Sequence, residues 1–135
     1  MRIAVDTNVL LRFLLADDPV QHRAAVETLE QATAVILPIV ALCEVGWVLN
    51  RTYGLSREEI ATMLRGLTSI GNVEYDVTEV EAGLVMLDAG GDFADGVIAR
   101  QGRLRRADAF LSFDLKAVKR LNASGEHALV PGARS

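Results

Sequence analysis

Two acidic residues early in the chain stand in hydrophobic surroundings. Asp6 follows the apolar residues 3–5, and an Asp at the carboxyl end of a buried strand faces the crevice where open α/β sheets bind ligands. Glu44 is the only charged residue of ILPIVALCEVGWVLN, a segment typical of a buried helix. A carboxylate placed there needs a cation, or its pKa rises. Because no Lys or Arg lies within one helical turn, Glu44 indicates a bound metal, with the distant Arg12 as the alternative partner.

Two further acids have the same character. Asp95 lies in GDFADGVIAR, three residues after Asp92, which can cap a helix, and it is expected on the inward face of that helix. Asp114 ends the strand-like residues 109–113. Several acids that end strands or face inward from helices converge only around a cation. The structural alternative is a helix cap for Asp6 and Asp114, and an interaction with the helix dipole for Asp95.

The elements that position these acids alternate between strand and helix. The pattern predicts strands over residues 2–6, 34–37, 73–77, 109–113 and 127–130. It predicts helices over 7–15, 19–31 and 115–121, one that starts at Pro38, one after Asp92, and two with the capping boxes Ser56/Glu59 and Thr78/Glu81. Strands separated by helices imply an α/β fold with a mostly parallel central sheet and helices on both faces.

The bulk properties fit one α/β domain over residues 1–135, with residues 132–135 as a frayed tail. No signal peptide is expected, and Pro38 and Glu44 interrupt the only stretch near membrane-span length, so we expect no membrane contact and a cytoplasmic location. A single cysteine excludes an internal disulfide and a cysteine metal cluster. The net charge of −4 argues against a broad basic nucleic-acid surface but leaves a nuclease open, because an acidic metal site itself adds negative charge.

The acid-bearing motifs, in this order, resemble the PIN domain, and specifically the VapC-type toxins of bacterial toxin–antitoxin pairs. The motifs are DTN at 6–8, the lone Glu44, DFADGVIA at 92–99 and SFD at 112–114, and the resemblance covers essentially the whole chain. The sequence departs from the family at Gly96, where Ala is more frequent, and at Ser112, where Thr is. Glycine at position 96 is expected to loosen the helix that carries Asp95.

The resemblance implies a metal-dependent endoribonuclease whose products carry 5′-phosphate and 3′-hydroxyl ends. By this resemblance, the catalytic and metal-binding acids would be Asp6, Glu44, Asp95 and Asp114. Together they would hold one or two Mg²⁺ or Mn²⁺ ions. Asn8 and Ser112 would assist. The resemblance also implies a homodimer and a cognate antitoxin protein that neutralises the acidic groove with an Arg or Lys.

Candidate RNA contacts lie at the far end of the helix that carries Asp95 and in the short helix predicted at 115–121. They are Arg100, Arg103, Arg105, Arg106 and Lys116. The structural alternative is ordinary solvated charge at the carboxyl end of a helix.

Three other functions fit parts of the pattern. The first is a PIN-like RNA-processing nuclease that is not a toxin, and the second is a non-enzymatic partner-binding module that holds a structural ion. A phosphoryl-transfer enzyme with Asp6 as its nucleophile is disfavoured, because Asn8 stands where that chemistry usually needs a second Asp.

Overall fold

The computed structural model describes residues 1–132, so the predicted tail at 132–135 lies, apart from Gly132, outside the described residues. The helices of this part are α1 (Thr7–Leu14), α2 (Pro19–Gln31), α3 (Ile39–Arg51), α4 (Arg57–Thr68), α5 (Val77–Asp88), α6 (Phe93–Leu104) and α7 (Leu115–Ala123). The strands are β1 (Arg2–Ala4), β2 (Ala34–Ile36), β3 (Val73–Glu74), β4 (Phe110–Leu111) and β5 (Ala128–Leu129). The predicted α/β class and the order of elements are confirmed, although every strand is shorter than predicted.

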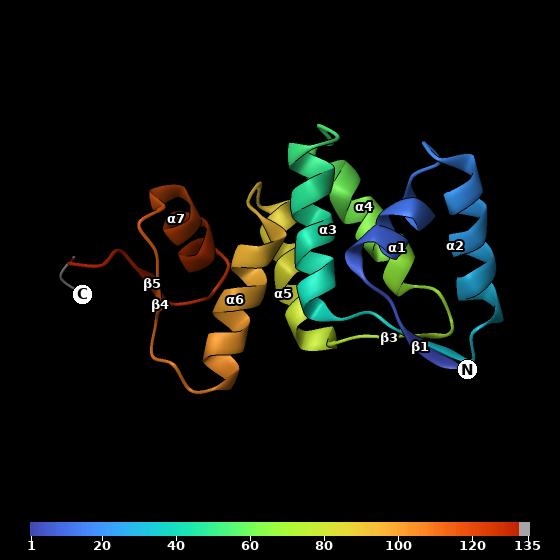
Figure 1. Ribbon diagram of the computed structural model, residues 1–135. Helices are drawn as coiled ribbons and strands as arrows, with labels where there is room; N and C mark the ends of the chain where they lie inside the picture. Colours follow the sequence, from blue (N-terminus) through green and yellow to red (C-terminus); the bar gives the residue numbers. More distant parts are fainter. Residues whose placement is uncertain (133–135) are drawn as a thin grey trace.

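The strands form two sheets, both parallel (Figure 1). One sheet has the order β1-β2-β3, with Ile3 opposite Val35 and Val35 opposite Val73. The other consists of β4 and β5, with Phe110 opposite Ala128. All pairs are parallel, as the alternation of strands and helices requires.

Local side-chain chemistry explains where most of the helices begin. The Asp18 carboxylate accepts a hydrogen bond at the start of α2. The predicted capping box of α4 is confirmed: Ser56 accepts from the Glu59 amide, and the Glu59 side chain accepts from the Ser56 amide. The second predicted capping box is wrong, because α5 starts before it and both Thr78 and Glu81 lie inside the helix.

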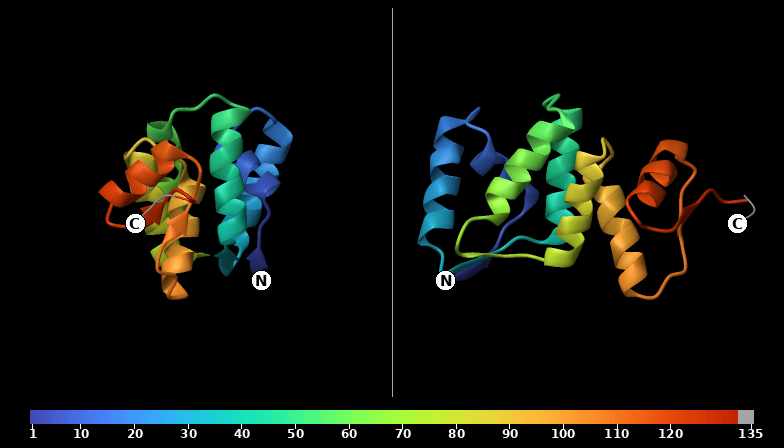
Figure 2. Two further views of the ribbon diagram at one scale, coloured as in Figure 1. Left: turned by 90° about the vertical axis from the view of Figure 1, so that its left-hand side faces the viewer. Right: turned by 180° about the vertical axis from the view of Figure 1, so that it is seen from behind.

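The hydrophobic interior is divided in two. The larger core joins the three-stranded sheet to α1 through α6 and includes Leu10, Val35, Leu42, Leu64 and Val97. A smaller cluster holds the β4–α7–β5 unit against α5 and α6, and consists of Met86, Ala99, Ala117, Leu121 and Ala128. Figures 1 and 2 show this unit at one end of an elongated molecule and the three-stranded sheet toward the other, with α3, α5 and α6 between them.

The helices of residues 1–132 are all too short or too polar to span a lipid bilayer.

Candidate active site

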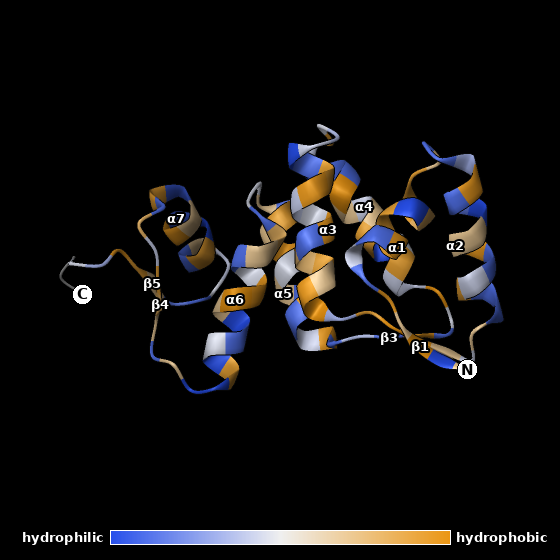
Figure 3. Ribbon diagram, viewed as in Figure 1, coloured by the Kyte–Doolittle hydropathy of each residue, from blue (hydrophilic) through white to orange (hydrophobic). Residues whose placement is uncertain are grey.

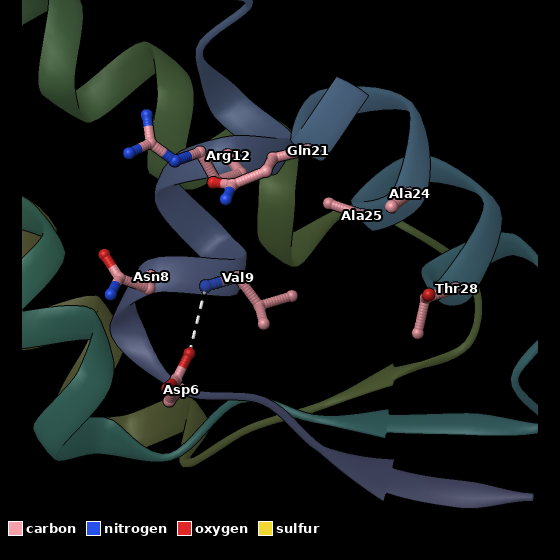
Figure 4. Close-up of a pocket in the computed structure, with 8 residues that line it drawn as sticks. All are labelled: Asp6, Asn8, Val9, Arg12, Gln21, Ala24, Ala25 and Thr28. Atoms are coloured by element: carbon pink, nitrogen blue, oxygen red, sulfur yellow. Dashed lines mark hydrogen bonds between the residues drawn. The ribbon is translucent and has the colours of Figure 1, made fainter. Parts of the chain in front are cut away.

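Asp6 lies at the junction of β1 and α1, where it serves as the N-cap of the helix. Its Oδ1 accepts a hydrogen bond from the Val9 amide at 3.0 Å (Figure 4). The helix-capping role that the sequence offered as an alternative for Asp6 is therefore confirmed. The side chain is nevertheless exposed. It borders a cavity of about 480 Å³ between α1 and α2, whose polar lining also includes Asn8, Arg12 and Gln21. Asp6 is therefore available to a ligand while it caps its helix.

Glu44 is exposed, which contradicts the prediction that it is buried. It lies on a stripe of α3 with Val40, Trp47 and Arg51, all exposed, because residues three or four positions apart share one side of a helix. The opposite side of α3 enters the core, and Figure 3 shows hydrophobic and hydrophilic residues alternating along this helix. The near-absence of charge in the sequence hid this exposed stripe, because apolar residues also occupy surface positions.

Asp6 and Glu44 line one cavity, of about 390 Å³, together with Asn8 and Tyr53. Residues 38 positions apart in the sequence thus face the same cavity beside the end of β1. Arg12, the alternative partner predicted for Glu44, pairs with another acid: its guanidinium forms an ion pair with Asp17 at 3.1 Å.

Asp95 lies in the first turn of α6, half-buried, beside a cavity of about 180 Å³ that Cys43 and Trp47 of α3 also line. Burial raises the pKa of its carboxyl group, and the negative charges of Asp92 and then Asp114 raise it further. Asp95 and Asp114 are therefore close enough to interact electrostatically.

Asp92 occupies the N-cap position of α6, but the prediction that it caps the helix is wrong, because its side chain makes no capping hydrogen bond. Its carboxylate instead forms an ion pair with Arg57 of α4 at 2.9 Å. The Arg57 Nε also donates to the Gly91 carbonyl at 2.9 Å. Arg57 thus fixes the turn before α6, and with it the position of Asp95.

Asp114 caps α7, and its Oδ1 accepts from the Lys116 and Ala117 amides at 3.0 and 3.1 Å. The Ser112 hydroxyl oxygen accepts from the Asp114 amide at 3.0 Å, so Ser112 shapes the turn between β4 and α7. The Asp114 side chain remains exposed, like that of Asp6.

The donor chemistry of these acids suits a hard divalent cation, which takes oxygen ligands. The geometry of the single chain does not: within residues 1–132, no three His, Cys, Asp or Glu side chains lie close enough together to hold a metal ion. The acids fall into two pairs. Asp6 shares a cavity with Glu44, and Asp95 is electrostatically coupled to Asp114.

Within residues 1–132, the predicted basic patch divides into arginines that pair with a carboxylate and arginines that do not. Arg100 and Arg103 contact the same oxygen of Glu126 at 3.1 and 3.2 Å, and the Glu126 side chain is only 8% exposed. Arg105 and Arg106 are exposed beyond the end of α6, where Arg106 has a positive φ of 64°. The role of Glu126 was missed, since nothing in its local sequence signals a contact with residues more than 20 positions away.

A sequence profile of the PIN domain matches residues 3–122. The chain belongs to the PIN domain family. No curated protein matches it. Membership indicates a nuclease that acts on RNA, and such PIN domains are often metal-dependent. The matched range contains all four candidate acids of this PIN domain but not Glu126.

Proposed function

We propose that this PIN domain is an endoribonuclease that depends on Mg²⁺ or Mn²⁺ and leaves 5′-phosphate and 3′-hydroxyl ends. The main support is the placement of its acids in a chain that matches the PIN family over residues 3–122. Asp6 and Asp114 each follow a strand and begin a helix, and Asp95 lies in the first helical turn. These positions leave carboxylate oxygens at the ends of elements, where a charged substrate has access.

In this proposal, the carboxylates of Asp6, Glu44, Asp95 and Asp114 would hold one or two ions once the two pairs of acids are brought to one site, and the ions would supply charge neutralisation at the scissile phosphate. Asn8 borders both cavities that Asp6 lines and would contact the substrate. Ser112 would act indirectly, by holding the turn that carries Asp114.

The basic residues assigned to RNA contact are those without a carboxylate partner among residues 1–132. Arg105, Arg106 and Lys116 are exposed and form no ion pair with a described carboxylate, whereas Arg100 and Arg103 pair with Glu126. We therefore assign the first three to phosphate contacts and the other two to support of α6.

We further propose that the protein is a VapC-type toxin of the cytoplasm, that it forms a homodimer, and that a cognate antitoxin protein neutralises it. The exposed carboxylates support this proposal, since an Arg or Lys of a partner segment could pair with them. A PIN-like nuclease for RNA processing would use the same site without the antitoxin.

The test is cleavage of several structured RNAs, transfer RNA included, by purified protein with Mg²⁺ or Mn²⁺, with EDTA, and with Asp6→Asn. Asparagine also caps helices, so this change removes the charge and keeps the cap. We expect EDTA to abolish cleavage and Asp6→Asn to slow it at least about 100-fold, since even the partners of metal ligands contribute 10- to 100-fold.

Asp76→Asn is the matched control, because Asp76 also precedes a helix, is exposed and makes no side-chain capping bond. Its activity should equal that of the wild type. Cleavage that survives both EDTA and Asp6→Asn would refute the carboxylate mechanism. No cleavage of any RNA, together with intact metal binding, would favour the non-enzymatic binding module.

A further inference from the structure

Both sheets have an open edge. Among residues 1–132, β1 pairs with β2 alone, and β4 pairs with β5 alone. The Val5 amide donates to β2, so the alternation of a strand directs the Ala4 amide to the other side. The Phe110 and Ser112 amides donate to the β5 side, so the Leu111 amide is likewise directed away from β5. Each edge therefore presents backbone groups that a further strand could pair with.

The exposed surface is larger than that of a compact chain of this size. A folded monomer of 14.6 kDa exposes about 6,900 Å², whereas this chain exposes 7,991 Å². The excess of about 1,100 Å² per chain is of the order that one partner loses in a standard interface, about 800 Å². Large apolar side chains at and just after β4 contribute to it: Leu111 is 56% exposed, Phe113 79% and Leu115 69%.

The two open edges belong to opposite parts of the same chain. Figure 1 and the right-hand view of Figure 2 both place α3, α5 and α6 between β1 and β4. The exposed connection at residues 105–108 leads the chain away from the three-stranded sheet after α6. In this conformation β4 lies apart from its own β1, so a strand that pairs with the free edge of β1 would have to come from another molecule.

We propose that the edge of β1 pairs with β4 of a second copy, so that two chains together complete each acid site. Every strand pair within the chain is parallel, and parallel pairing here would bring the carboxyl ends of β1 and β4 together. Asp6 follows β1, and Asp114 follows β4. Each site of the dimer would then combine Asp6 and Glu44 of one copy with Asp114 of the other.

This inference rests on the proposed nuclease function for the role of the acids, but not for the strand pairing. Because each copy offers both edges, a two-fold dimer uses each edge once and leaves neither open. It also explains why no three of these acids lie together within residues 1–132 of one chain.

The first test measures mass in solution by light scattering during size exclusion. The wild type should have twice the 14.6 kDa mass of one chain. Leu111→Pro removes the amide directed to the open edge and leaves the β4–β5 hydrogen bonds in place, since edge strands tolerate proline. We expect the dimer dissociation constant to rise at least about tenfold. Leu111→Thr, which keeps the amide, is the control and should affect dimerisation less.

Ala4→Pro makes the same change at the β1 edge and should also weaken the dimer. Circular dichroism of each variant checks that the fold is retained. A wild type that remains monomeric, or a dimer that resists both proline substitutions in folded protein, would overturn the proposal. A complex in which a different protein occupies the β1 edge in place of the second copy would overturn it as well.

The second test mixes two inactive variants, Asp6→Asn and Asp114→Asn, and measures RNA cleavage. If each site takes these residues from different copies, a mixed dimer has one site with both substitutions and one intact site. Mixed dimers make up half of a random mixture, so about a quarter of the wild-type activity should return. Sites formed within one chain would give no recovery, which would overturn the shared site. A dimer that Leu111→Pro dissociates, with a wild type that cleaves no RNA, would support the strand pairing and refute the nuclease function instead.

Discussion

Gly96 lies in α6, where this helix packs closely on α5. A Cβ added at Gly96 would lie 2.9 Å from the carbonyl carbon of Ala82 and 2.9 Å from the Met86 Cβ, and closer still to the Ala82 carbonyl oxygen. Ala82 and Met86 belong to α5, and the Ala82 atoms are backbone, which cannot rotate away. The sequence predicts that Gly96 loosens α6, so alanine there should stabilise the helix. The structure reverses that expectation.

The magnitude follows from two opposing effects. Replacing a helical Gly with Ala contributes about 1 kcal/mol through helix propensity. Inserting a methyl group into a closely packed contact costs about 1–3 kcal/mol, and the upper part of this range applies when backbone must move. We expect Gly96→Ala to lower the free energy of unfolding by about 1–2 kcal/mol, and the Tm by about 3–10 °C for a domain of this size.

The assay is thermal and urea unfolding of the variant beside Gly66→Ala. Gly66 lies in α4, is exposed, and an added Cβ there meets no atom within 4 Å. Gly66→Ala should therefore stabilise the protein by about 1 kcal/mol through propensity alone. If Gly96→Ala raises the free energy of unfolding as much as Gly66→Ala does, the reasoning that α5 lies too close to position 96 for a methyl group is refuted.

Two further predictions concern charge. The pKa of Asp95 is higher in the folded state than in the unfolded state, where it is about 3.9. The free energy of unfolding therefore falls as the pH rises above about 3.9, and it stops falling once the pH has passed the folded pKa. Asp95→Asn should thus have a higher Tm than the wild type at pH 7 and an equal Tm at pH 3; an equal difference at both pH values would contradict this. Replacing Arg105 and Arg106 with alanine should weaken RNA binding and lower the slope of log K against log salt by about 1.4, since each contact to single-stranded RNA contributes about 0.7. Arg65→Ala, which removes an arginine already paired with Asp88, should leave the slope unchanged, and a comparable change in both variants would exclude a specific role for the pair.

Much of the local structure could be predicted because its causes lie within a few residues. The Ser56 and Glu59 side chains bond to each other's backbone three residues apart, so their capping box is visible in the sequence. Asp6 and Asp114 were recognised at strand–helix junctions for the same reason, and both act as caps there. The α/β class followed from the alternation of apolar strands with helices.

The surroundings of Glu44 could not be predicted in the same way. Its apolar neighbours indicated a buried helix, but which side of α3 enters the core depends on its packing against α1, α4 and α6, and α1 and α6 come from distant parts of the chain. The exposed stripe that holds Glu44 faces away from the residues buried in the core.

The sequence by itself determined the family, the candidate acids and the ends of most helices, because these depend on residue types and short spacings. Only the tertiary structure decided the partners of the charges: Arg57 with Asp92, and both Arg100 and Arg103 with Glu126. It also decided that the strands divide into two sheets and the acids into two pairs. Such contacts join residues far apart in the chain, and their geometry is set by how whole elements pack.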